Sequence, residues 1–332
     1  MIRRIVICLL SIVLLPLSLK AKPQPKEVAA LSVEQEAQFK YYWYAAKRAT
    51  EERRYADAYA LLEFCRMLKP TDGRTLVFLG MLYDGIGAKE KANEAYRQAF
   101  EADPGDYWYR YSDVLLSLHT MEGFNAAIKV LEQAHKAQTS KGGKADEDML
   151  DQLARMYMSA GEWKKAIVIL DEIDTQKGYD AYSAANRFRA YMIGGKTKLA
   201  LGEIDKYLEL DPTNVQFMLF RMEVLERTNA KQKDLYAQYE KILEMDPLNL
   251  GVLNNYAYHL ATHNGDLQKA ERMSAITLRE EPNNPVYLDT YGWILHLKGE
   301  DELALFYLNR ALMNRTESTR EEIIKHINQI KK

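Results

Sequence analysis

The 332-residue sequence has little of what enzymes and disulfide-bonded domains require. It holds two cysteines and six histidines, and it lacks the patterns G-x-x-x-x-G-K-[ST], G-x-S-x-G and H-E-x-x-H of phosphate-binding loops, nucleophile elbows and zinc helices. The 45 basic and 47 acidic residues leave no positive surplus for binding nucleic acid. Gly142-Gly143 and the neighbouring lysines are expected to form a flexible connector rather than a phosphate-binding site. These absences favour binding to proteins over covalent chemistry or nucleic-acid recognition.

Long hydrophobic runs are also absent, except at the N-terminus. Arg3-Arg4 precede an apolar run over Ile5–Leu15, and Leu19-Lys20-Ala21 supplies a cleavage site. This pattern predicts a signal peptide over residues 1–21, because the run is too short for a comfortable membrane span. We therefore expect an exported protein, periplasmic or envelope-associated, with an uncleaved anchor as the alternative.

Cleavage would remove three basic residues and no acid, leaving 42 basic and 47 acidic residues in the mature chain. Residues 22–32 then form a short tether. Of the two cysteines only Cys65 would remain, so no intrachain disulfide can form, and we expect a buried, inert thiol there.

What the sequence does have is a repeat. Pro212, Pro247 and Pro282 stand 35 residues apart, and Pro70 and Pro104 stand 34 apart. A period this even over most of the chain is typical of stacked repeats rather than of one globular core. The functional question therefore concerns which surface faces which partner.

Segments aligned on these prolines share a pattern of helix, turn and second helix. Small residues recur where two antiparallel helices must approach closely: Gly80, Ala154, Ala257 and Gly292 in the first helix, and Ala92, Ala166, Ala270 and Ala304 in the second. Glycine at the turn accepts left-handed backbone angles, and proline stops the second helix. The sequence therefore predicts about eight helical hairpins between residues 33 and 316.

The pattern Gly80, Tyr83, Ala92, Tyr96, Ala99, Pro104 resembles the signature of the tetratricopeptide repeat (TPR) family. Two units are degenerate, because Phe188 and Leu235 stand where that family prefers small side chains. The resemblance implies an all-α, right-handed superhelical solenoid over residues 33–316. It also implies a scaffold or adaptor that binds a partner protein or peptide, with no cofactor, no small-molecule substrate and no enzyme activity.

A last amphipathic helix is expected over residues 317–332. Thr319 and Glu322 have the spacing of a capping box, and Ile323, Ile324 and Ile327 share one side. A solenoid needs such a lid so that its last unit does not expose bare core.

In the family that the chain resembles, the first helices of successive units line a concave groove for an extended peptide or a partner's helix. Transferred unit by unit, the groove positions carry amides, arginines and aromatic rings, which suit peptide backbone, carboxylate and apolar contacts. The predicted partner-binding residues are Gln152, Arg155, Tyr182, Asn186, Arg189, Arg221, Asn255, Tyr258 and Trp293. The Lys/Asn carboxylate clamp of some relatives is absent.

Two alternatives stay open. The first is a structural subunit of an envelope assembly or secretion complex, held through its convex or terminal faces. A metal-binding or enzymatic protein would use His259, His263 and His296, although no carboxylate completes a motif there. The aromatic run Tyr41–Tyr44 predicts exposed aromatic surface near the N-terminus, because four consecutive helical positions cannot all face the core.

Overall fold

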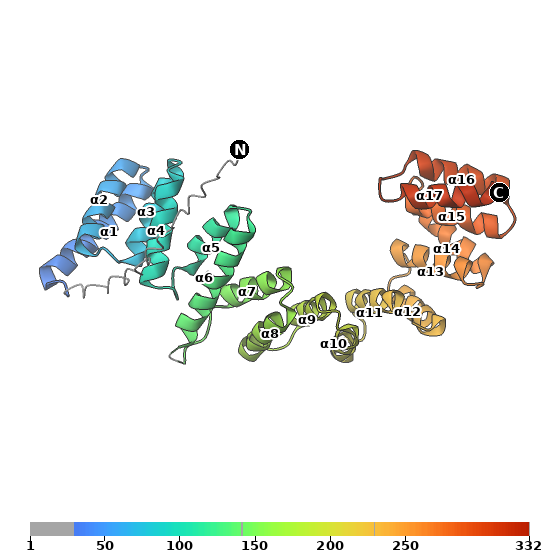
Figure 1. Cartoon of the computed structure of the whole chain (residues 1–332), viewed down its shortest axis with the longest axis horizontal. Helices are drawn as coiled ribbons and strands as arrows, with labels where there is room; N and C mark the ends of the chain where they lie inside the picture. The colour runs from blue at the N-terminus through green and yellow to red at the C-terminus, as the bar shows by residue number, and fades with distance from the viewer. Residues whose placement is uncertain (1–29, 141, 229, 332) are drawn as a thin grey trace, which may run out of the picture. The chain divides into compact units, whose positions relative to one another are not determined.

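The computed structural model describes residues 30–331, with the exceptions of 141 and 229. In this part of the chain seventeen α-helices and no strand are present, which confirms the all-α repeat prediction. Figure 1 labels the helices, which fall into two compact units that divide after Ala102. We call residues 30–102 the N-terminal unit and residues 103–331 the C-terminal unit.

The N-terminal unit contains α1 (Val33–Glu51), α2 (Tyr55–Leu68), α3 (Gly73–Gly85) and α4 (Lys89–Ala102). The C-terminal unit contains α5 (Trp108–Ser117), α6 (Met121–Thr139), α7 (Glu147–Ser159), α8 (Trp163–Lys177), α9 (Ala181–Ile193), α10 (Thr197–Leu210), α11 (Val215–Arg227), α12 (Gln232–Met245), α13 (Leu250–Thr262), α14 (Leu267–Glu280), α15 (Pro285–Leu297), α16 (Asp301–Met313) and α17 (Arg320–Ile330).

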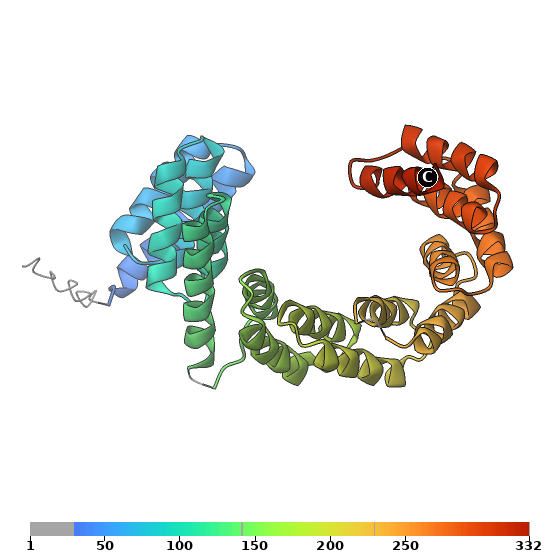
Figure 2. The ribbon, with the colours of Figure 1, turned by 45° about the vertical axis from the view of Figure 1, so that its right-hand side comes forward.

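Each odd-numbered helix from α1 to α15 packs on the helix that follows it, which makes eight hairpins in the described chain. Within the C-terminal unit, Figure 2 shows these pairs following one another as successive layers. The predicted small residues lie in the seams: a Cβ added to Gly80 would lie 2.4 Å from Cε1 of Tyr96, and one added to Gly292 would lie 2.8 Å from Cγ of Leu308. The degenerate position Phe188 is filled differently, because its ring stacks on Phe220 with centroids 4.7 Å apart.

Short polar residues begin the first helix of most pairs. The side chains of Asp72, Asp146, Asp180, Asn214 and Asn249 each accept a hydrogen bond from the backbone N–H three residues on. Each such cap satisfies one of the N–H groups that a helix start leaves without a partner. Local sequence therefore fixes where these first helices begin.

The turn within a pair uses a left-handed residue, as expected, but this residue is not always glycine. Gly87 and Gly161 have φ of 73° and 75°. In the α13–α14 turn the left-handed residue is Asn264 (φ 56°), not Gly265. Asparagine tolerates this region better than most side chains, and a Cβ on Gly265 would lie 2.8 Å from Cδ2 of Leu260. Gly265 is therefore needed for close packing rather than for its backbone angles.

The C-terminal helix α17 packs on α15 and α16, with Ile323 and Ile327 buried against Leu288 and Leu308. The predicted capping box is wrong. Thr319 has helical backbone angles, and its hydroxyl instead accepts from the N–H of Thr316 at 3.0 Å. The local turn over 316–319 competes for the hydroxyl, which leaves the side chain of Glu322 free for another contact.

Cys65 is fully buried, and burial chiefly raises the pKa of its thiol to about 11. The thiol is therefore protonated near neutral pH, as expected for an inert side chain. The predicted signal peptide (1–21) and most of the tether lie outside the described residues. Among the helices of residues 30–331, none combines the length and the apolar character that a membrane span needs.

Candidate functional site

The first helices of the C-terminal unit share one surface, held together by polar contacts between neighbouring pairs. Gln152 of α7 contacts Ser112 of α5 (3.4 Å), and the hydroxyl of Tyr182 in α9 donates to Asp151 of α7. Further along, Asn255 of α13 donates to Glu226 of α11 at 3.5 Å. We call the surface made by α5, α7, α9, α11, α13, α15 and α17 the first-helix face.

The nine predicted partner-binding residues all lie on helices of this face, and they differ in their exposure to solvent. The side chain of Arg155 is 61% exposed and pairs with Asp151 at 2.9 Å. Tyr182 is 42% exposed. Asn186 is buried, and its Oδ1 accepts a hydrogen bond from exposed Arg189 at 3.0 Å. Arginines are thus available here for contact, whereas the Asn186 amide positions one of them.

The other predicted residues are held by neighbours. Arg221 donates to Asp205 and to Gln238, both at 3.0 Å. The indole of Trp293 stacks on the imidazole of His326, with centroids 4.3 Å apart and planes 18° apart. His326 belongs to α17, so the lid helix contributes to the surface that the repeats form.

A cavity of about 280 Å³ opens on this face where α11, α13, α15 and α17 meet. It brings together the predicted residues Asn255 and Tyr258. The lining residues are Glu226, Asn254, Asn255, Tyr258, His259, Val286, Asp289, Thr290 and Glu322.

Three carboxylates line this cavity, and among the residues that the structure describes no lysine or arginine lines it. Glu226 accepts from the hydroxyl of Tyr239, and Glu322 lies 3.5 Å from the hydroxyl of Tyr258. Asp289 pairs with Nδ1 of His326 at 3.0 Å. Glu226 and Glu322 therefore contact neutral donors only, and the cavity is acidic.

His259 adds no positive charge to the cavity at neutral pH. Burial lowers the pKa of its imidazole below the ordinary 6.5; Glu226 opposes this shift, and His263 reinforces it. The cavity therefore keeps its negative character over the physiological range.

This shift predicts a stability difference at acid pH. Because the folded pKa of His259 is lower than the unfolded one, the unfolded chain binds more protons below about pH 6.5, and stability falls as pH falls. We expect the wild type to lose more stability between pH 7.5 and pH 5.5 than His259→Gln does, measured by urea unfolding at both values. Equal losses in the two proteins would show that His259 titrates normally.

Sequence reasoning missed Asn254, Glu226, Asp289 and Glu322. Asn254 precedes the predicted groove residue Asn255 by one position, and Asp289 is not among the predicted groove positions. Glu226 belongs to a degenerate repeat, and the spacing from Thr319 predicted a role in a capping box for Glu322. Glu226, Asp289 and Glu322 lie on three different helices, so no local sequence pattern pointed to them.

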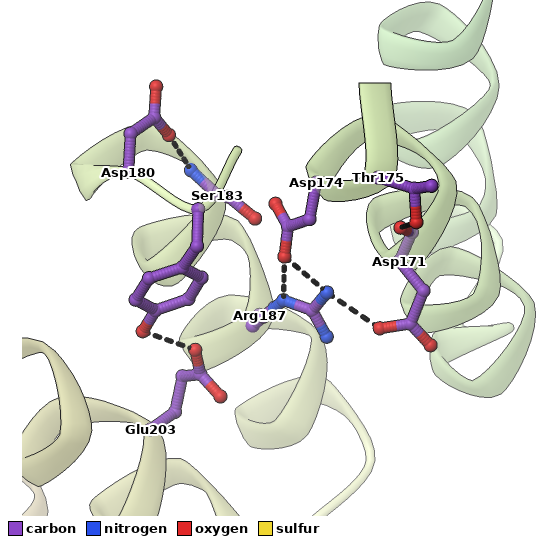
Figure 3. A network of polar contacts seen from close by, with 8 residues as sticks. Asp171, Asp174, Thr175, Asp180, Ser183, Arg187 and Glu203 are labelled. Carbon is purple, nitrogen blue, oxygen red and sulfur yellow. Dashed lines mark hydrogen bonds and ion pairs between the residues drawn. The ribbon is translucent and has the colours of Figure 1, made fainter. Parts of the chain in front are cut away.

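A second polar cluster lies between α8 and α9, around the buried side chain of Arg187 (Figure 3). Its Nη2 lies 2.6 Å from Asp171 and 2.6 Å from Asp174. Burial alone lowers the pKa of the guanidinium, but hydrogen bonds to the two aspartates outweigh it, so the pKa is raised. This cluster joins two neighbouring pairs and is structural, because its charges already have partners.

The histidines of the metal alternative do not come together as a metal site. The rings of His259 and His263 stack with centroids 5.2 Å apart, while His296 pairs with Asp301 at 2.6 Å. Within residues 30–331 no group of three or more His, Cys, Asp or Glu is placed to hold a metal ion.

The N-terminal unit carries the exposed aromatic surface that its sequence predicted. Tyr41 and Tyr44 of α1 are exposed, as are Phe64 and Met67 of α2. The ring of Phe64 stacks on Tyr42, with centroids 5.2 Å apart. This patch is a second surface that a partner could cover.

No protein-family model matches the chain. Over 208 residues, 61% of the chain, the sequence is 27% identical to human (Homo sapiens) Superkiller complex protein 3. That match covers 13% of the human protein, and the chain spans the same small share of the mouse relative.

Solved structures resemble most of the chain. The match to the structure of Naa15/Naa10 bound to HypK-THB covers 90% of this chain and 46% of the matched chain, with a TM-score of 0.58 and 14% identity. The C-terminal part of a TPR repeat-containing protein from Cytophaga hutchinsonii matches 76% of this chain and 98% of its own, with a TM-score of 0.53 and 19% identity. At such low identity the likeness shows the fold alone.

Proposed function

The described chain has the tetratricopeptide-repeat fold, and we propose from this premise that it is a scaffold that binds a partner protein through its first-helix face without covalent chemistry. The observation that carries the proposal is the set of exposed polar side chains and the exposed Tyr182 on α7 and α9, together with the acidic cavity lined by α11, α13, α15 and α17 on the same face. Arginine and tyrosine are enriched at interface hot spots, and these two helices expose Arg155, Arg189 and Tyr182.

The similar proteins support this proposal. One neighbouring structure contains Naa15/Naa10 bound to HypK-THB, and the human relative is named as a protein of a complex. Both names place a protein similar to this chain beside protein partners. The chemistry of the face agrees, because solvent-exposed arginines can pair with carboxylates of a partner at little conformational cost.

A pull-down from cell-envelope extract tests the proposal. The bait is the mature chain, and the test variant is Arg155→Glu/Arg189→Glu. The matched control is Lys233→Glu/Lys241→Glu, which reverses two exposed charges on the second helix α12. We expect one partner to be retained by the wild type and the control and lost by the test variant. Retention by both variants would place binding elsewhere.

A structural subunit of a larger assembly is the second candidate. The exposed aromatic patch of α1 and α2 favours it, because apolar surface of this kind is commonly covered in a complex. Size-exclusion chromatography of envelope extract separates the two candidates. A stable, very large complex that survives Arg155→Glu/Arg189→Glu and dissociates with Tyr41→Ser/Phe64→Ser supports the subunit role.

Export is part of the proposal and rests on the charged and apolar pattern of residues 1–21. We propose that this segment is removed and that the mature chain works in the periplasm or at the envelope. N-terminal sequencing of the protein purified from its own cells tests this. A mature start near Lys22 supports export, and a retained Met1 in the cytoplasmic fraction overturns it.

A further inference from the structure

The cavity between α11, α13, α15 and α17 has a chemistry of its own. We propose that it accepts a lysine or arginine side chain of the partner, whose cationic end contacts Glu226 and Glu322. This inference rests on the proposed function, because it names the partner group that the first-helix face would recognise.

Charge is the first argument. Three carboxylates line one cavity to which the described part of the chain contributes no lysine or arginine, and His259 stays neutral there. Bringing like charges together in a partly buried place costs free energy unless a cation joins them. An ammonium or guanidinium group would relieve this cost for Glu226 and Glu322 together.

An unpaired acceptor is the second and independent argument. Asn254 lines the cavity and is 5% exposed, yet its Oδ1 is buried without a hydrogen-bond partner. Nearly all buried polar atoms in proteins have a partner, and each exception needs an explanation. A lysine or arginine side chain would supply the missing hydrogen-bond partner, because its charged group carries N–H donors and no acceptor.

Shape agrees with a single side chain. The volume of about 280 Å³ lies just below the range of about 300–1,000 Å³ that is typical of sites for drug-sized molecules. Tyr258 and Val286 add an aromatic and an aliphatic wall. A tyrosine ring attracts a cation through its π face, and the stem of a lysine or arginine packs on apolar surface.

The long contact between Tyr258 and Glu322 marks where the cation would sit. Their oxygens are 3.5 Å apart, at the outer limit of a hydrogen bond. A charged donor forms a shorter and stronger bond to the carboxylate than the phenol does. Because Glu322 comes from α17, the lid helix would help to select the partner as well as cover the last hairpin.

The direct test is a titration followed by methyl NMR. The probe is N-acetyl-arginine-N-methylamide, and its neutral isostere N-acetyl-citrulline-N-methylamide is the control ligand. Val286 lines the cavity, so its labelled methyl groups report binding, and exposed Val168 on α8 reports non-specific effects. We expect the arginine probe to shift Val286 alone, with at least about tenfold weaker binding in Glu226→Gln/Glu322→Gln.

A second variant separates binding from folding. Asn254→Leu removes the unpaired acceptor at similar volume, so we expect weaker probe binding together with unchanged or raised stability. Equal shifts by the arginine and citrulline probes overturn the inference, as does full binding by the double glutamine variant. The melting temperature of Asn254→Leu shows whether this variant is folded, so that weaker probe binding is not mistaken for unfolding.

The partner itself distinguishes this inference from the function on which it rests. If the pull-down partner survives Glu226→Gln/Glu322→Gln but is lost with Arg155→Glu/Arg189→Glu, the first-helix face binds the partner and the cavity does not take its cation. If both double variants release the partner, the inference and the proposed function stand together. If neither double variant affects the partner, the proposed function fails, whatever the probe shows.

Discussion

Replacing Gly80 by tryptophan is expected to destabilise the N-terminal unit by about 3 kcal/mol or more. Even a Cβ at this position would lie 2.4 Å from the ring of Tyr96, inside any tolerable contact. That ring cannot easily move away, because it is 2% exposed and its hydroxyl donates to Asp84 at 2.8 Å. The indole would therefore force α3 and α4 apart. Thermal unfolding followed by circular dichroism should show a midpoint lower by about 12 °C or more for the affected transition.

Gly85→Trp is the matched control for this prediction. Gly85 ends the same helix, it is exposed, and a Cβ added there has no neighbour within 4 Å. We expect a change within about 0.5 kcal/mol, as for most surface substitutions. If Gly80→Trp melts like the wild type and like the control, the pairing of α3 with α4 is wrong.

Removing the buried cation of the C-terminal unit is expected to have an effect of similar size. Arg187→Met removes the cation that pairs with Asp174 and puts an apolar group in its place. The side chain of Asp174 is 17% exposed. Breaking one half of a buried ion pair costs about 3–5 kcal/mol, because the remaining charge is uncompensated. Urea unfolding should report the loss.

Two further variants test the cause. Arg187→Met/Asp174→Leu removes both charges, so we expect much of the stability to return. Arg227→Met breaks a pair with Glu223 in which both side chains are exposed (65% and 43%), and we expect a loss below about 1 kcal/mol. Equal losses for Arg187→Met and Arg227→Met would show that burial does not strengthen the Arg187 contacts.

Repetition explains why the fold could be predicted from the sequence. The spacing of Gly80, Ala92 and Tyr96 fixes which faces meet, and the Asp and Asn caps fix where first helices begin. Features that depend on competition between neighbours were not predictable in this way. Thr319 had a suitable partner three residues on and another in Thr316, and only the structure shows that it contacts the latter. The repeat period likewise gives no sign of the division after Ala102.

The candidate site was predictable in its location but not in its chemistry. The register of the repeats placed Asn255 and Tyr258 on the first-helix face, and both line the cavity. The charge of the cavity comes from Glu226, Asp289 and Glu322, which belong to three different helices. Their convergence depends on how successive hairpins and α17 stack, and no local pattern encodes that arrangement. The role of these residues in binding remains a prediction.

Site-specific photo-crosslinking tests the central claim most directly. A photoreactive amino acid is placed at exposed Arg155 or Arg189 on the first-helix face and, in parallel, at exposed Lys233 or Lys241 on α12. Each protein is irradiated in the cells that make it, and adducts are read by immunoblot and mass spectrometry. We expect the same partner to be captured from positions 155 and 189 and not from 233 or 241. Capture from α12 alone would contradict the claim that the first-helix face binds the partner.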